Sequence, residues 1–158
     1  MTITELHINK SFLKEKAGNY KSGFYYQEHT NSLNVKEMNV GLYFVGDQQI
    51  TDKLSVFSQI GLSPREKYKN NRYYSIGINC KGLIAGPPDD RFGTAIAYAG
   101  INDKSVGSET AIEMTYKLVI NNNIYLKPDI QYIINPAGTA IRLNNALVGF
   151  VRFGLEFE

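Results

Sequence analysis

The most regular feature of the chain is the alternation of apolar and polar side chains. Between residues 109 and 120, even-numbered positions such as Ile112 and Leu118 are mostly apolar, whereas Glu113 and Lys117 occupy odd-numbered positions. Successive side chains of a β-strand point to opposite faces of its sheet, so a period of two predicts a strand with one apolar and one polar face. The longest runs keep this period over roughly 10 to 12 residues, which is typical of strands that cross a membrane.

Similar runs recur along the whole chain, and together they predict about nine strands. The predicted strands cover residues 2–12, 20–28, 38–45, 54–62, 73–83, 91–101, 109–120, 124–134 and 147–157. None of the connections suggests a helical crossover, so consecutive strands are expected to run antiparallel. The predicted fold is therefore all-β, with the strands arranged as an antiparallel up-and-down meander.

The predicted connections alternate between two kinds. Turns are expected at residues 14–19, 46–53, 84–90 and 121–123, and mostly longer, more polar loops at residues 29–37, 63–72, 102–108 and 135–144. Short turns at one end of the strands and longer loops at the other are typical of outer-membrane barrels. Pro128 has no backbone N–H to donate and lies a few residues from the predicted turn at residues 121–123, so a β-bulge is expected near the rim.

Alternation alone does not say whether the apolar face points into the centre of a barrel or outward to lipid. A soluble up-and-down barrel that binds a small apolar ligand in its interior is one alternative. Aromatic residues near the ends of the apolar faces, such as Tyr20, Phe44, Tyr74 and Phe92, favour the outward arrangement, because membrane barrels carry aromatic girdles at both interfaces. The pattern thus favours a partial transmembrane β-barrel. A small, complete outer-membrane barrel with a structural role is a further alternative.

Composition narrows the classes of function. Lys and Arg number 17 against 15 Asp and Glu, and this near-balance gives no reason to expect a nucleic-acid partner. Cys80 is the single cysteine, and His7 and His29 lie far apart, so neither a disulfide nor a metal site is expected. No combination of nucleophile, base and oxyanion donors is visible, and we expect neither enzymatic activity nor a cofactor. No run of about 18 apolar residues suggests a transmembrane helix.

Several segments resemble the carbohydrate-selective porins of the OprB type. LKPDIQYIINPAG (residues 126–138) and NNALVGFVRFGLEF (residues 144–157) look like the C-terminal end of that family. CKGLIAGPPDDRFGTAIAYAGI (residues 80–101) is similar to a glycine- and proline-rich segment of the family, and ETAIEMTYKLVI (residues 109–120) to its acidic strand start. Pro87 and Lys127 depart from the family pattern, which commonly has Arg and Gln there, and Glu158 follows the usual terminal aromatic, Phe157.

This resemblance implies a bacterial outer-membrane porin that passes sugars by passive diffusion through a barrel of about sixteen strands. Since about nine strands cannot close such a barrel, residues 1–158 are interpreted as its C-terminal portion, without the N-terminal strands and the signal peptide. The expected partners are permeating sugars, outer-membrane lipid and the missing N-terminal part of the barrel. A homo-oligomer is a further expectation.

Polar residues that share a parity with the predicted lumen face are the candidate site. Mixed charges on facing strands order water, and their hydrogen bonds can replace the hydration shell of a sugar. Arg152 and Glu113 are the strongest candidates for this role. The alternative is that these are ordinary wall charges, each satisfied by a neighbour across the strands. The candidate channel-lining residues are Lys81, Arg91, Glu113, Lys117, Lys127, Asp129, Gln131 and Arg152.

The adjacent carboxylates Asp89 and Asp90 could suggest acid catalysis or a cation site. They follow two prolines in a predicted turn, where Asp side chains commonly bond to the local backbone. We therefore expect the pair to cap the turn.

Overall fold

The structure is a computed structural model of the chain. It describes residues 1–13, 15–30, 34–63, 70–83, 89–101, 107–121, 123–139 and 141–155. Pro87, Phe157 and Glu158, on which part of the family resemblance depends, lie outside the described residues.

The described residues form nine strands in one sheet, in the order in which they occur along the chain. Each strand pairs antiparallel with the next, so the predicted meander is confirmed. A 3₁₀ turn follows the eighth strand at Pro136–Gly138. The strands are β1 (Thr2–Asn9), β2 (Gly18–Thr30), β3 (Lys36–Gln49), β4 (Leu54–Leu62), β5 (Asn70–Lys81), β6 (Arg91–Ile101), β7 (Glu109–Asn121), β8 (Ile124–Ile134) and β9 (Ala146–Leu155).

The turn predicted at residues 46–53 is shorter than expected. Gly46 continues β3 and pairs with Ser58, and Gln49 pairs with Ser55. A Cβ on Gly46 would lie only 3.1 Å from the ring of Phe44, so this glycine makes room for an aromatic side chain rather than for a turn. The true turn begins at Ile50, whose N–H donates to the carbonyl of Leu54 at 2.8 Å.

Other strand ends also differ from the prediction. β1 ends at Asn9 instead of continuing to residue 12, and the ring of Phe12 packs edge-on against Tyr20 with centroids 5.0 Å apart. An irregularity near the rim, where the bulge was expected, lies between Val119 and Asn121, beside the turn. At Pro128 itself the strands stay in register, since Thr115 opposite Asp129 and Leu118 opposite Leu126 share one register.

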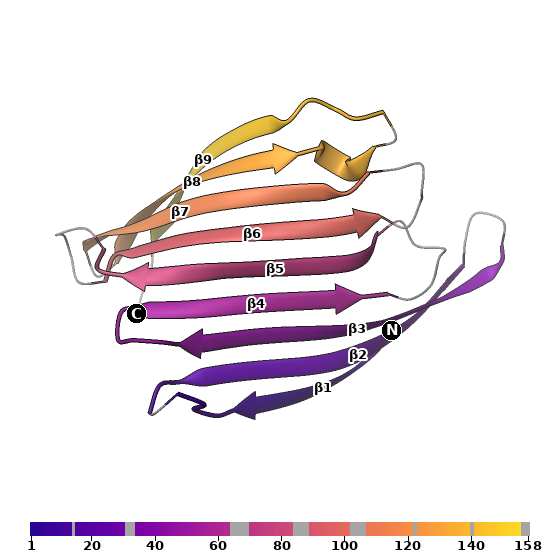
Figure 1. Ribbon diagram of the computed structural model, residues 1–158, viewed down its shortest axis with the longest axis horizontal. Helices are drawn as coiled ribbons and strands as arrows, with labels where there is room; N and C mark the ends of the chain where they lie inside the picture. The colour runs from indigo at the N-terminus through magenta and orange to yellow at the C-terminus, as the bar shows by residue number, and fades with distance from the viewer. Residues whose placement is uncertain are drawn as a thin grey trace.

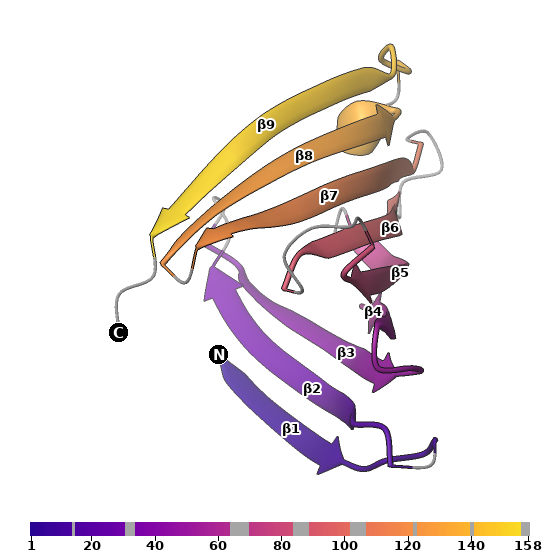
Figure 2. The same cartoon turned by 90° about the vertical axis from the view of Figure 1, so that its left-hand side faces the viewer.

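The sheet is bent into an open trough. Figure 1 shows β1 and β9 at its two margins, and Figure 2 shows both margins turned toward the same side. Within the described residues, β1 has β2 as its only neighbour and β9 has only β8. The trough therefore has a concave face, a convex face and two open edges.

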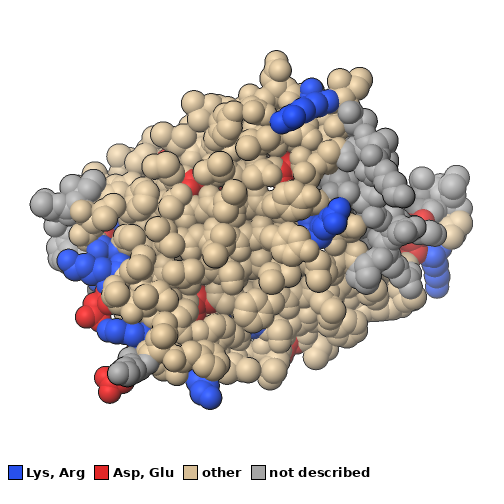
Figure 3. Space-filling view, in the orientation of Figure 1, with Lys and Arg blue, Asp and Glu red and all other residues tan. Residues whose placement is uncertain are grey.

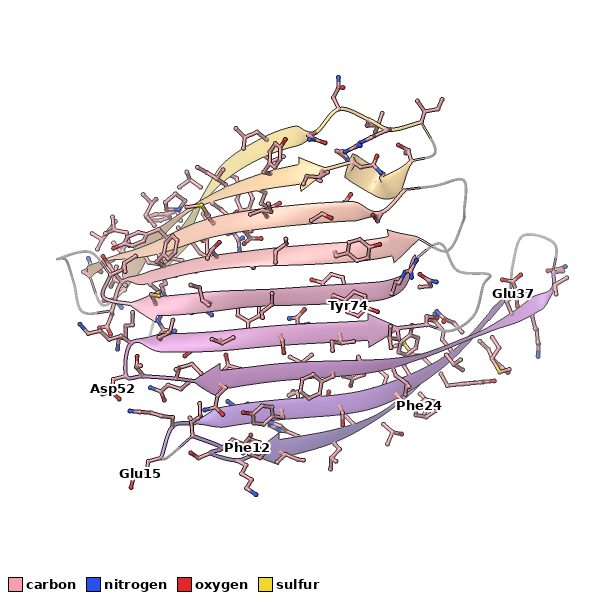
Figure 4. All side chains as sticks on the ribbon, viewed as in Figure 1. Phe12, Glu15, Phe24, Glu37, Asp52 and Tyr74 are labelled. Carbon is pink, nitrogen blue, oxygen red and sulfur yellow. The ribbon has the colours of Figure 1, made fainter. Side chains whose placement is uncertain are left out.

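Large apolar side chains cover the convex face. They are the even-numbered residues of β1 to β8 and the odd-numbered residues of β9, such as Ile76 at 54% exposure, Ile130 at 56% and Leu147 at 74%. Figure 3, drawn from this side, shows a broad uncharged surface with most charged atoms toward the strand ends, and Figure 4 labels Phe24 and Tyr74 on the same face. The apolar residues therefore do not form a dry centre, and the prediction of a soluble barrel with an apolar interior is wrong.

Candidate functional site

Polar side chains gather on the concave face, where they line a hollow of about 420 Å³. The hollow extends across strands β3 to β8. The curvature of the sheet brings side chains from these strands toward one another on its concave face (Figure 2). Its lining residues are Asp47, Ser55, Asn79, Arg91, Gly93, Thr115, Lys117 and Lys127. All of them occupy odd-numbered positions.

The structure places every predicted channel-lining residue on this concave face. Lys81 lies opposite Arg91, and Arg91 lies opposite Lys117. Glu113 lies opposite Gln131, whose Nε2 donates to its Oε2 at 3.0 Å. The remaining predicted residues, on β8 and β9, are Lys127, Asp129 and Arg152, and Lys127 lies opposite Arg152.

Arg152 and Glu113, the two strongest candidates, have separate partners. Arg152 forms an ion pair with Asp129, with Nη2 3.4 Å from Oδ2, and its guanidinium also lies over the ring of Phe150 at 5.0 Å. Asp129 is diagonal to Arg152 across β8 and β9, whereas Glu113 lies on β7 and hydrogen-bonds to Gln131. The side chain of Asp129 is fully buried, and its Oδ1 has no hydrogen-bond partner in the structure.

Aromatic rings that lie against glycines are a feature of this wall that the sequence analysis missed. Tyr43 lies opposite Gly23, and Tyr125 lies opposite Gly154. A Cβ on Gly154 would come within 2.2 Å of the ring of Tyr125, so the ring must lie flat along the neighbouring strand. The sequence signal would have been a glycine directly opposite an aromatic residue on the neighbouring strand. Recognising such a pair requires knowledge of the strand register. Flat rings keep large side chains out of the lumen.

Tyr125 also meets a cation. The ammonium of Lys117 lies 4.1 Å from the centroid of its ring, which is within cation–π range. Together with the ion pair between Arg152 and Asp129, this contact fixes long basic side chains against the wall.

The two aspartates before β6 have separate roles. The exposed Asp89 pairs with Lys81 at 3.0 Å. Asp90 is only 1% exposed, and it accepts hydrogen bonds from the hydroxyl of Tyr116 and the N–H of Val119, both at 2.8 Å. Asp90 therefore ties the start of β6 to β7. Most of the turn that the pair was expected to cap, residues 84–88, lies outside the described residues.

Aromatic residues form pairs near both ends of the convex face. Phe92 lies opposite Tyr116 toward the short turns, and Tyr74 stacks on Tyr98 with centroids 6.2 Å apart toward the longer loops. These two aromatic pairs lie at the two positions where membrane barrels carry their interfacial aromatic girdles.

The part of the chain that the structure describes contains no group of three or more His, Cys, Asp or Glu residues arranged to hold a metal ion. Among the same residues, no helix is long and apolar enough to cross a membrane.

An antiparallel meander with an apolar convex face and a charged, polar concave face defines the class, which is the wall of a porin-type β-barrel. The sequence matches the family described as "Carbohydrate-selective porin, OprB family" over residues 8–157, and the chain belongs to that family. It is a family of outer-membrane porins rather than of enzymes.

The structure titled "High pH structure of Pseudomonas putida OprB" has the same fold. The two superpose with a TM-score of 0.82 at 18% sequence identity, over 96% of this chain and 47% of the other. The chain thus spans about half the length of the structure that it matches. A search of curated protein sequences finds no match.

Proposed function

We propose that this chain forms part of the wall of a bacterial outer-membrane porin through which sugars diffuse passively. The observation that carries the proposal is the separation of the two faces. Ile76 and Leu147 project from the convex side, while Glu113, Lys127 and Arg152 share the concave side. An apolar exterior avoids the cost of charge in hydrocarbon, and a polar interior keeps a water-filled path.

Hydrogen bonding on the concave face supports a neutral, hydroxylated solute. Glu113 and Gln131 present a carboxylate and an amide side by side, and Ser55, Asn79 and Thr115 add hydroxyl and amide groups around the hollow. A sugar entering the lumen exchanges bonds to water for bonds to these groups. Passage remains fast because each exchange is close to balanced.

Further strands complete the barrel in this proposal. The free margins of β1 and β9 present unpaired backbone groups, each of which costs several kcal/mol in hydrocarbon. We infer that residues 1–158 are the C-terminal portion of the barrel and that N-terminal strands pair with these margins. A second copy of the chain is the competing partner.

Liposome swelling tests the function. The protein is refolded into phospholipid vesicles, its β-structure is checked by circular dichroism, and the vesicles are diluted into isosmotic glucose. Swelling that is faster with glucose than with a large oligosaccharide supports a sugar-permeable pore. Folded, inserted protein that leaves the vesicles impermeable to glucose contradicts it.

Cross-linking tests the completion of the barrel. A cysteine is introduced at Thr4 in β1 and another at Val151 in β9, in a Cys80→Ser background. A disulfide between these cysteines across two copies would assign the margins to a second copy of the chain. Folded, inserted protein in which neither cysteine joins another copy would support completion of the barrel by N-terminal strands.

A further inference from the structure

Basic side chains form one continuous row across the concave face of β5 to β9. Lys81 lies opposite Arg91, Arg91 lies opposite Lys117, and Lys127 lies opposite Arg152. The register that places Thr115 opposite Asp129 and Leu118 opposite Leu126 also sets Lys117 opposite Lys127. With strands about 4.8 Å apart, the row follows an arc of about 19 Å along the wall.

Strand pairing does not account for this basic row. Like charges placed directly opposite one another destabilise a sheet, and the row places them so at each step from Lys81 to Arg152. The two ends of the row are balanced by acids, since Lys81 pairs with Asp89 and Arg152 with Asp129. At its centre, Arg91 and Lys127 have no such acidic partner among the described residues.

Arg91, Lys117 and Lys127 form the centre of the basic row, and all three line the hollow of about 420 Å³. Asp47 is the one acidic residue in the lining, against these three bases. Within the described parts of the chain, neither Arg91 nor Lys127 has a carboxylate within ion-pair distance. Glu113 acts on Lys127 only through longer-range attraction.

Neutral hydrogen-bonding groups surround these cations. Ser55, Asn79 and Thr115 line the same hollow, on strands β4, β5 and β7. A guanidinium is suited to a phosphate or carboxylate group, and hydroxyl and amide groups are suited to the hydroxyls of a sugar ring. The hollow thus combines both kinds of recognition.

We propose that the centre of the basic row is a binding site for anionic sugars, which carry a phosphate or carboxylate group. Arg91 and Lys127 hold the anionic group, and the neutral residues of β4, β5 and β7 contact the ring. This inference rests on the proposed function, because it places a charged class of sugar within the same lumen.

Calorimetric titration of the full chain, folded in detergent micelles, tests the site with glucose, glucose 6-phosphate, gluconate and inorganic phosphate. We expect glucose 6-phosphate to bind at least about tenfold more tightly than glucose at low ionic strength, with the difference shrinking as salt screens the charges. Gluconate distinguishes a carboxylate site from a phosphate site. Equal affinity for glucose and both anionic sugars would overturn the proposal, and equal affinity for inorganic phosphate and glucose 6-phosphate would overturn its sugar component.

Single variants locate the site. Arg91→Gln and Lys127→Gln should each weaken binding of glucose 6-phosphate several-fold and weaken binding of glucose by a smaller factor. Lys36→Gln is the matched control. It removes a positive charge from the start of β3, whereas Asp47, which lines the hollow, lies near the other end of that strand. Equal losses in all three variants would overturn the site. The salt titration of the unaltered chain requires no variant, so it decides the question even if a substitution prevents folding.

The outcomes also separate this inference from the proposed function. Vesicles that swell in glucose, with no preference for anionic sugars in the titration, would leave the porin proposal standing and overturn the basic site. Tight binding of glucose 6-phosphate by folded protein that conducts no sugar would support the site and contradict the pore.

Discussion

Arg152 and Asp129 join the last two strands through an ion pair in which one partner is buried and the other is not. Oδ2 of Asp129 lies 3.4 Å from Nη2 of Arg152, and the side chain of Asp129 is fully enclosed while that of Arg152 is 53% exposed. A buried carboxylate keeps its charge only where a cation or hydrogen-bond donors compensate for the lost water. The guanidinium of Arg152 therefore contributes more to the sheet than its own exposure suggests.

Removing Arg152 should destabilise the sheet. Arg152→Gln leaves the carboxylate of Asp129 without its cation, and we expect a loss of about 1–3 kcal/mol in the free energy of unfolding. Asp129→Asn should cost less, because an amide tolerates burial without a cation. Guanidinium titration in lipid vesicles gives both values. Equal losses for the two variants would show that the exposed arginine does not compensate the buried charge.

Neighbouring residues on opposite faces of β6 test the orientation of the wall. Ile96→Lys places a charge on the convex face, where we expect a loss of about 2–4 kcal/mol in a bilayer. Ala97→Lys, one position along the strand, places the same charge on the concave face and should cost much less. Unfolding titrations of both variants in vesicles give the comparison. If Ile96→Lys is the milder change, the convex face does not contact lipid.

Glycines of β9 test whether the aromatic rings lie flat. At Gly154 an added Cβ would meet the ring of Tyr125 at 2.2 Å, whereas at Gly149 the nearest atom, the carbonyl oxygen of Asp129, is 3.9 Å away. We expect Gly154→Ala to destabilise the sheet by about 1–3 kcal/mol through overpacking, and Gly149→Ala to be nearly neutral. Adding Tyr125→Leu should relieve the effect of Gly154→Ala in the same unfolding assay. Failure of that rescue would assign the cost to the backbone instead of the ring.

The turn between β3 and β4 carries a pH-sensitive contact outside the membrane-spanning strands. The hydrogen bond and positive charge of Lys16 hold the pKa of Asp52 below its ordinary value of 3.8. A carboxyl whose pKa is lowered by folding contributes stability above its unfolded pKa, and loses it as the pH falls through the folded pKa. Figure 4 shows Asp52 at the same end of the sheet as Glu15.

The titration of Asp52, followed by NMR of its carboxyl carbon, should therefore have a midpoint below 3.8. Lys16→Gln should return the midpoint toward the ordinary value, and Lys36→Gln, at the opposite end of β3, should leave it unchanged. A midpoint that does not respond to Lys16→Gln would mean that the two side chains do not interact in solution.

The strands and their two faces could be predicted from the sequence because a period of two depends only on local chain geometry. The prediction failed where one residue type has two uses. Gly46 was interpreted as part of a turn, yet it lies within β3 beneath the ring of Phe44.

The site could be predicted as a set of residues but not as an arrangement. Parity assigns Lys81, Lys117 and Arg152 to one face, but only the register shows that they belong to one row. Register depends on where each turn begins and on the irregularity between Val119 and Asn121, which alternation does not reveal. For the same reason the sequence does not reveal that Arg152 pairs with Asp129.

The pairing of every strand with its neighbour in sequence has a consequence for how the protein folds. Each hairpin from β1 to β9 closes over a short stretch of chain, so loop-closure entropy opposes each step only weakly. The sheet can therefore grow one hairpin at a time. Only the pairing of its outer strands, β1 and β9, with other strands brings together segments that are far apart along the chain. We expect that last step to limit the rate of assembly, and the inner hairpins to be protected from hydrogen exchange before it occurs.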